Sequence, residues 1–228
     1  MLLMAILDFL IPDRCHLCGS QLPEGVRGLC PLCAAGLERT GFHLKADNAM
    51  TMRLAGRVKF VRAAGHFYYT PDSPLAMLIH DFKYRGRPSL ARRLGEIAGN
   101  ELQGDGFLTD IDLLMPVPLH WLKRMRRGYN QAEEIALGIA RSSGLRVSTD
   151  LKATRGHRSQ TRMTHEERQH NTEGIFRLRH AERYAGLHIA LIDDVCTTGS
   201  TLASAAQALL DAAPGARVSL LSLAVTIA

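Results

Sequence analysis

Residues 187–202 constrain the fold of this chain more than any other segment, because they combine an apolar strand, two acids and a loop that opens a helix. The apolar run 187–192 is followed by Asp193 and Asp194, and soon after by five small residues: Thr197, Thr198, Gly199, Ser200 and Thr201. Backbone N–H groups at the start of a helix are unpaired and lie at the positive end of its dipole, so they bind phosphate. Gly199 lets the backbone bend and approach closely. The segment therefore predicts a phosphate site beyond a buried strand.

The two acids extend this prediction. Asp193 and Asp194 would repel a phosphate held in the same pocket, so they must face groups that donate hydrogen bonds, and the vicinal hydroxyls of a ribose are the obvious donors. The alternative is that the acids cap the next turn and that the loop is merely polar. That alternative explains each residue taken alone about as well as a ligand site does. It explains the whole ordered group of residues less well. The chain has neither the glycine pattern of a dinucleotide fold nor a triphosphate loop.

Strands and helices alternate along the main part of the chain. Apolar patterns predict strands at residues 62–69, 111–115, 174–178, 187–192 and 217–226, and helices at 73–84, 89–102, 131–142 and 201–212. This order predicts an α/β fold with a mostly parallel sheet and helices on both faces, whose ligands bind outside the carboxyl ends of the strands. We expect a main domain at residues 60–228 behind a small N-terminal unit at residues 1–45.

Two C-x-x-C pairs predict a metal site in the N-terminal unit. Cys15 and Cys18 form the first pair, and Cys30 and Cys33 form the second after eleven intervening residues. Four thiolates complete the closed tetrahedral site that structural zinc prefers and leave no position for water or substrate, so we expect a structural, zinc-ribbon-like module. Two disulfides are the competing interpretation, which the lack of an export signal disfavours. Cys196 is expected to be a small packed residue.

The first eleven residues are apolar, but no Lys or Arg precedes them and no cleavage site follows. They are shorter than the roughly 20 apolar residues of a spanning helix, so we expect a short helix on the protein's own surface and no membrane span. The cytoplasm is the expected compartment. A net charge of +6 suits a protein that handles phosphates, whether on a small molecule or on a polynucleotide.

Further residues carry a resemblance to a known family. In addition to the four cysteines and the acidic pair with its hydroxyl loop, these are residues 116–119, residues 127–131, Arg155, Gln160, Arg168 and Asn171. With this combination the chain resembles the type I phosphoribosyltransferases and, among them, the ComF family associated with DNA uptake in natural competence. The resemblance covers almost the whole chain.

The resemblance implies a role for each of these groups. Asp193 and Asp194 would bind the ribose hydroxyls of phosphoribosyl pyrophosphate, and residues 197–201 its 5-phosphate. The turn formed by Val117, Pro118, Leu119 and His120 is similar to the family's pyrophosphate loop. The polar segment 155–171 is similar to its mobile catalytic loop, whose Arg155 and Arg168 would meet the leaving pyrophosphate. Magnesium is expected to bridge the ribose hydroxyls and the diphosphate.

A basic segment at residues 121–129 carries two aromatic residues and the four cations Lys123, Arg124, Arg126 and Arg127. This composition suits contacts with the backbone charges of single-stranded DNA and stacking on its bases. The alternative is a basic surface loop that leads into a helix. Sequence composition alone favours that plainer interpretation, and the family resemblance favours a nucleic-acid site.

Three classes of function follow. The first is a protein that binds phosphoribosyl pyrophosphate or a nucleotide and acts in DNA uptake and natural transformation, with single-stranded DNA and a DNA-uptake motor protein as expected partners. The alternative is an active phosphoribosyltransferase of nucleotide metabolism, although no pocket for an acceptor amine or base is recognisable in the sequence. A regulatory module that responds to a purine or nucleotide is a third class.

Overall fold

The computed structural model describes residues 13–154 and 175–226. Its centre is a five-stranded sheet in the order β1-β7-β6-β2-β3, in which every pairing is parallel. The strands are β1 (Ala63–Tyr69), β2 (Leu113–Pro116), β3 (Arg146–Val147), β6 (His188–Cys196) and β7 (Arg217–Thr226). β6 and β7 are buried along nearly their whole length, as expected for parallel strands that are covered on both faces.

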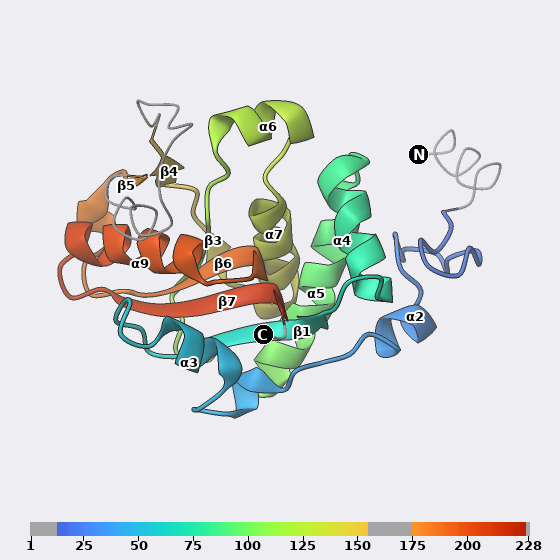
Figure 1. The fold of residues 1–228 in the computed structure, drawn as a ribbon, viewed down its shortest axis with the longest axis horizontal. Coiled ribbons are helices and arrows are strands. Elements are labelled where there is room, and N and C mark those ends of the chain that lie inside the picture. Colours follow the sequence, from blue (N-terminus) through green and yellow to red (C-terminus); the bar gives the residue numbers. More distant parts are fainter. Residues whose placement is uncertain (1–12, 155–174, 227–228) are drawn as a thin grey trace.

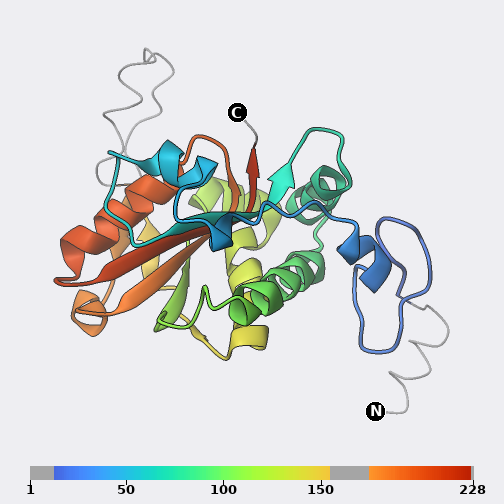
Figure 2. The same ribbon diagram turned by 90° about the horizontal axis from the view of Figure 1, so that it is seen from below.

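Helices cover both faces of this sheet, with α3 and α9 on one side and α5 and α7 on the other (Figure 2). Each long helix begins at a site that its sequence marks. Ser73 caps α4, Asn130 caps α7, and prolines occupy the first turns of α4 and α5. The helices of the main unit are α3 (Ala49–Leu54), α4 (Pro74–Tyr84), α5 (Pro88–Gly104), α6 (Trp121–Arg127), α7 (Gln131–Ser143) and α9 (Ser200–Ala212).

Smaller elements complete the described part of the chain. A separate two-stranded antiparallel sheet consists of β4 (Leu151–Ala153) and β5 (Phe176–Leu178). The remaining elements are the short helix α2 (Pro31–Ala35) and the 3-10 turns η1 (Phe42–Leu44) and η2 (Ala181–Tyr184). Figure 1 shows α2 and the adjoining loops beside α4 and α5, at the end of the molecule remote from β5.

The parallel strands β2 and β6 are neighbours in the sheet, but the connections that follow them run toward opposite edges. From β2 the chain continues through α7 to β3, toward one edge of the sheet, and from β6 it continues through α9 to β7, toward the other. Two neighbouring strands whose connections diverge in this way leave a crevice at their carboxyl ends, and open α/β sheets bind their ligands there. The loops after β2 and β6 flank this crevice.

The predicted fold class is confirmed, with three local differences. The strand expected at 174–178 forms β5, but β5 pairs with β4 outside the main sheet. The strand expected at 187–192 continues to Cys196, because its ladder with β7 extends past the acidic pair. Residues 121–127, taken as a loop in the plainer interpretation, form helix α6. The helix expected within the first eleven residues lies outside the described residues.

Candidate functional site

The acidic pair lies in the last third of β6, at the carboxyl edge of the sheet. Asp193 is opposite Ser222 of β7 in the parallel register, and its Oδ1 accepts a hydrogen bond of 2.8 Å from the backbone N–H of Asp194. Successive strand residues point to opposite faces, so the two carboxylates leave the strand in different directions. Burial and the neighbouring Asp194 carboxylate raise the pKa of Asp193 to about 7. The site thus holds two acids in a place that disfavours two negative charges.

A lysine to which the sequence analysis gave no role completes this site. Lys83, in the last turn of α4, places its Nζ 3.0 Å from Oδ2 of Asp194. Both side chains are mostly shielded, with 17% and 16% of their area exposed. No local sequence signal connects the two residues, which are 111 positions apart (194 − 83). Only the packing of α4 beside the sheet brings them together.

The hydroxyl loop follows β6 directly and leads into α9. Gly199 caps the helix in the left-handed conformation, with φ of 78°, and a Cβ atom there would lie 2.8 Å from Cδ2 of Leu54. Thr198 Oγ1 accepts from the backbone N–H of Ser200 at 3.4 Å. The loop surrounds a small hollow lined by Asp193, Val195 and residues 196–202. It therefore has the shape and the helix N-terminus that the phosphate prediction requires.

Two arginines from the segment before β1 support this loop from outside. Arg53 of α3 donates from Nη1 to the carbonyl oxygens of Cys196, at 3.2 Å, and of Thr197, and from Nη2 to that of Thr226. Arg57 donates to the carbonyl of Thr198 at 2.8 Å. These bonds turn the loop carbonyls toward the arginines. The sequence analysis missed both residues, since nothing local predicts which carbonyls they reach.

The turn after β2 forms the opposite wall of the crevice. Val117 is buried, and its N–H donates to the carbonyl of Ile192 at 2.8 Å, which ties the turn to β6. Asn130 caps α7 and donates from Nδ2 to the carbonyl of Val117 at 3.0 Å. Pro118, Leu119 and His120 follow as half-buried residues that lead into α6. The expected pyrophosphate loop and the acidic pair thus lie on adjacent strands.

Helix α6 carries the four cations that were predicted to contact nucleic acid, but not all four are exposed. None of its residues is buried, and Lys123, Arg124 and Arg126 are exposed. Arg127 instead donates to Gln131 Oε1 at 3.0 Å and stacks over the ring of Tyr84. Tyr129, expected as a stacking residue, donates its hydroxyl proton to the carbonyl of Phe82.

The aromatic residue that α6 does present is Trp121, whose exposed area is 46%. Leu122 and Met125 of the same helix are also exposed. Charges and apolar surface therefore occur together on a helix that stands clear of the sheet (Figure 1). Arg155 and Arg168, the predicted catalytic pair, lie outside the described residues.

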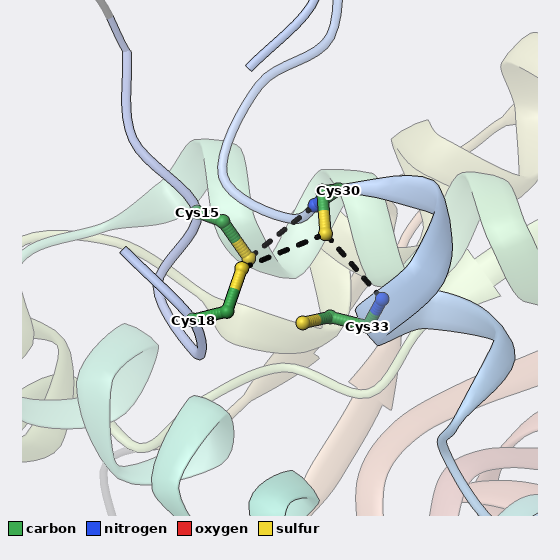
Figure 3. A group of neighbouring side chains, drawn as sticks. All are labelled: Cys15, Cys18, Cys30 and Cys33. Carbon is green, nitrogen blue, oxygen red and sulfur yellow. Dashed lines mark hydrogen bonds between the residues drawn. The ribbon is translucent and has the colours of Figure 1, made fainter. Parts of the chain in front are cut away.

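The four N-terminal cysteines come together as predicted. Their Sγ atoms lie within 4.8 Å of one another, and Cys18 Sγ is 3.8 Å from Cys30 Sγ. Figure 3 shows Cys15 and Cys18 from one loop converging with Cys30 and Cys33 from the start of α2, with the N–H of Cys30 directed at the sulfur of Cys15 and that of Cys33 at the sulfur of Cys30. None of the five cysteines forms a disulfide, so the disulfide interpretation is not supported.

The spacing and chemistry of this cluster fit zinc. Tetrahedral zinc with sulfur at about 2.3 Å places its ligand atoms about 3.8 Å apart, close to the Cys18 to Cys30 separation. Hydrogen bonds with Ser20 lower the pKa of Cys18 to about 6, whereas the hydrogen bond with Cys30 raises that of Cys33 to about 12. Four thiolates this close cannot all ionise without a cation between them. The fifth cysteine, Cys196, is buried, as expected for a small packed residue.

Magnesium would require oxygen ligands, and the carboxylates of Asp193 and Asp194 are ligands of that kind. They lie beside the crevice where a diphosphate would bring further oxygen atoms. The donor set therefore fits magnesium together with a phosphorylated ligand. None of the described helices is long and apolar enough to cross a bilayer.

The chain has distantly similar counterparts among solved structures. No family model matches the chain. Among solved structures, the glutamine phosphoribosylpyrophosphate amidotransferase of B. subtilis complexed with ADP and GMP is 15% identical, with a TM-score of 0.41 over 62% of this chain and 30% of that one. The hypoxanthine phosphoribosyltransferase of Trypanosoma cruzi complexed with IMP is 9% identical, with a TM-score of 0.38 over 60% and 74%.

Three curated proteins align with most of the chain. The DNA utilization protein YhgH of Escherichia coli O157:H7 is 30% identical over 218 residues, which are 88% of this chain and 92% of that protein. Competence protein F of Haemophilus influenzae is 28% identical over 83% and 87%, and competence protein ComFC of Bacillus subtilis is 26% identical over 93% and 85%. The four-cysteine cluster, the parallel sheet and this similarity along most of the chain lead to one conclusion: the protein belongs to the ComF/YhgH family.

Proposed function

We propose that this protein binds phosphoribosyl pyrophosphate at the carboxyl edge of its sheet, acts in DNA uptake and contacts single-stranded DNA through α6. The observation that carries the first part is that Asp193 and the loop 197–201 line one hollow, while the turn 117–120 follows β2, the strand beside β6. These groups come from two neighbouring strands whose connections diverge, which is where such sheets bind phosphorylated ligands.

Each group has a distinct task in this proposal. The N–H groups at the start of α9 and the hydroxyls of Thr197 and Thr198 hold the 5-phosphate. Asp193 and Asp194 accept hydrogen bonds from the ribose hydroxyls, and the turn 117–120 faces the diphosphate. Magnesium, when bound, neutralises the diphosphate. Arg53 and Arg57 hold the carbonyls of the loop in place before the ligand binds. Less conformational entropy is therefore lost when the ligand binds.

The DNA part of the proposal rests on α6 and on the names of the relatives. Exposed Trp121 stands beside exposed cations, the combination that binds single strands by stacking and by charge. One relative is called a DNA utilization protein and two are called competence proteins. A helix that no core residue anchors is free to present these groups to a polynucleotide.

The ribose site is tested by thermal shift and calorimetry with phosphoribosyl pyrophosphate, with magnesium and with chelator. We expect ligand stabilisation in the wild type and its loss in the double variant D193N/D194N, because a ligand that binds only the folded state raises its melting temperature. The control is D47N, an exposed acid outside the crevice. Equal ligand stabilisation of both variants would falsify the ribose assignment.

The DNA site is tested through Trp121, the only tryptophan of the chain. Stacking of a base on its indole should quench its fluorescence when a short single-stranded oligonucleotide is added at low salt. R124Q/R126Q should weaken binding and lower the slope of log affinity against log salt by about 0.7 per lost contact. The control is K45Q/K59Q, two exposed cations away from α6. An unquenched Trp121 and an unchanged slope place the DNA site elsewhere.

The same samples decide between a binding protein and an enzyme. If no oligonucleotide binds at low salt, while pyrophosphate is released from phosphoribosyl pyrophosphate on addition of an amine or base, the active transferase replaces the DNA proposal. The readout is pyrophosphate, which does not depend on knowing the acceptor in advance.

A further inference from the structure

The ion pair between Lys83 and Asp194 is held in place by the packing of the residues around Lys83. Phe82, the neighbour of Lys83, is fully buried and anchors the last turn of α4 in the core. The carbonyl of Phe82 also accepts the hydroxyl proton of Tyr129, which ties this turn to the segment before α7. Two contacts on the preceding residue therefore hold the backbone of Lys83, so its ammonium group reaches Asp194 from a fixed starting point.

The shielding of the pair increases its strength. Exposed ion pairs contribute little, because water and salt screen them. Here both side chains have only about one sixth of their area exposed, at 17% and 16%, so the charges interact through protein more than through solvent. The ammonium contacts Oδ2 of Asp194, and no described residue donates a hydrogen bond to Oδ1. One carboxylate oxygen thus stays available for a ligand while the other holds the lysine.

A second lysine acts on the other acid at longer range. Lys123 of α6 acts on Asp193 electrostatically, as Lys83 does, and both lysines oppose the effects of burial and of Asp194 on that carboxyl. Lys83 and Lys123 come from different elements, and their positive charges offset the negative charge of the acidic pair. Such a group can accept an anionic diphosphate without a free metal ion to cancel the acids.

We propose that Lys83 is the resident counter-ion of the acidic pair, and that Lys83 and a divalent cation compete for Asp194. The inference rests on the proposed binding of phosphoribosyl pyrophosphate. Its consequence is that the wild-type protein binds this ligand almost as well without magnesium as with it. Loss of the ammonium group leaves two carboxylates facing a diphosphate, and a metal ion then becomes necessary.

The first test does not involve the phosphoribosyl ligand. Manganese binding to the protein as purified is followed by water proton relaxation for the wild type, K83M and K59M. Methionine keeps the length of the lysine side chain without its charge, and Lys59 is an exposed lysine that precedes β1, at the opposite edge of the sheet. We expect K83M to bind manganese about tenfold more tightly than the wild type and K59M to be unchanged.

The second test measures the affinity for phosphoribosyl pyrophosphate in chelator and in millimolar magnesium. We expect the wild type to change by less than about threefold between the two conditions, and K83M to lose about tenfold in chelator and to recover in magnesium. An equal loss in both conditions overturns the inference, because Lys83 would then contact the ligand directly. No loss in either condition also overturns it.

The two tests separate the inference from the proposed function. If the wild type fails to bind phosphoribosyl pyrophosphate in either condition, the proposed function is wrong, and the manganese measurement still decides the role of Lys83. Equal manganese affinity of wild type and K83M overturns that role. The melting temperature of K83M reports its folding, and if it does not fold, K83Q is used. In a D194N background the same substitution should leave manganese binding unchanged, since the competing carboxylate is gone.

Discussion

At the scale of single residues, the crevice contains unfavourable chemistry that a ligand would relieve. Asp193 sits beside a second carboxylate and away from water, and for this reason its pKa is raised to about 7. Gly199 is held in a left-handed conformation that other side chains rarely adopt, and a Cβ atom there would lie 2.8 Å from Cδ2 of Leu54. Residues under such constraint are typical of binding sites, because the rest of the fold stabilises an arrangement that serves the ligand.

The raised pKa of Asp193 predicts how one substitution changes with pH. Between its unfolded pKa, about 3.9, and its folded pKa, about 7, the folded state binds the proton more tightly, so wild-type stability falls as pH rises through this window. D193N cannot ionise. Its melting temperature relative to the wild type should therefore rise from pH 4 to pH 8, by several degrees, and then level off. A difference that stays constant over this range would contradict the assignment.

At the scale of elements, the support for the crevice comes from the packing of α5 against α7. These helices approach so closely that their backbones touch: a Cβ on Gly95 would clash with the carbonyl of Ile135, and one on Gly138 with the carbonyl of Arg92. Glycines at helical spacing usually weaken a helix. Here they permit the close contact that positions Asn130, at the start of α7, against the turn 117–120.

Alanine at one of these contacts should therefore destabilise the protein. We expect G138A to lower the free energy of unfolding by about 3 kcal/mol, because the added methyl group meets backbone that cannot move aside. Gly104, at the end of α5, has open space around it. G104A should leave the stability unchanged or raise it by up to about 1 kcal/mol. Urea unfolding of the two variants measures both effects, and similar losses in both would show that the close contact is not what matters.

At the scale of the whole molecule, the four-cysteine module is joined to the sheet by a network of charges. Arg39 donates to the carbonyls of Ala34 and Leu37 near the end of α2, and its guanidinium contacts Glu101 of α5 at 2.8 Å. Nε2 of His66, a buried residue of β1, lies 3.0 Å from the same carboxylate. Burial lowers the pKa of His66, so this imidazole is neutral near pH 7, and Arg39 supplies the charge that Glu101 requires.

The ionisation of Glu101 makes this junction sensitive to acid. Its contacts with His66 and Arg39 lower its pKa to about 2, so it stabilises the folded state above its unfolded pKa of about 4.3, and this contribution is lost as pH falls toward 2. We expect E101Q to cost about 1 to 2 kcal/mol at pH 7, after allowance for solvent screening. The cost should shrink from pH 5 to pH 3. E182Q, at an exposed site of η2, is the control, and a cost independent of pH would contradict the ion pair.

The module itself should depend on its metal. We expect about one zinc per chain by elemental analysis, and its loss in C30S/C33S, because metal binding and folding of a closed thiolate site are coupled. In C196S, where the cysteine is remote from the cluster, zinc should be retained. Full zinc content in C30S/C33S would show that the metal is bound elsewhere.

The sequence by itself determined those features whose residues are neighbours in the chain. The strand, the acids and the loop of residues 187–202 are consecutive, and each C-x-x-C pair lies within one turn. Spacing alone therefore predicted the four-cysteine cluster and a helix start at Thr201, one residue after the observed start at Ser200. The alternation of strands and helices likewise predicted the α/β class, since local periodicity reflects which side of an element is buried.

Only the tertiary structure decided which distant groups meet. Nothing near Lys83 in the chain predicts that it reaches Asp194, or that Arg53 and Arg57 hold the carbonyls of the hydroxyl loop. The extension of β6 past Ile192 and the placement of β5 in a separate sheet depend equally on which strand lies alongside. The residue type fixes which interactions a side chain can make, but the packing of the whole chain decides which partner it meets. A local sequence pattern does not contain that information.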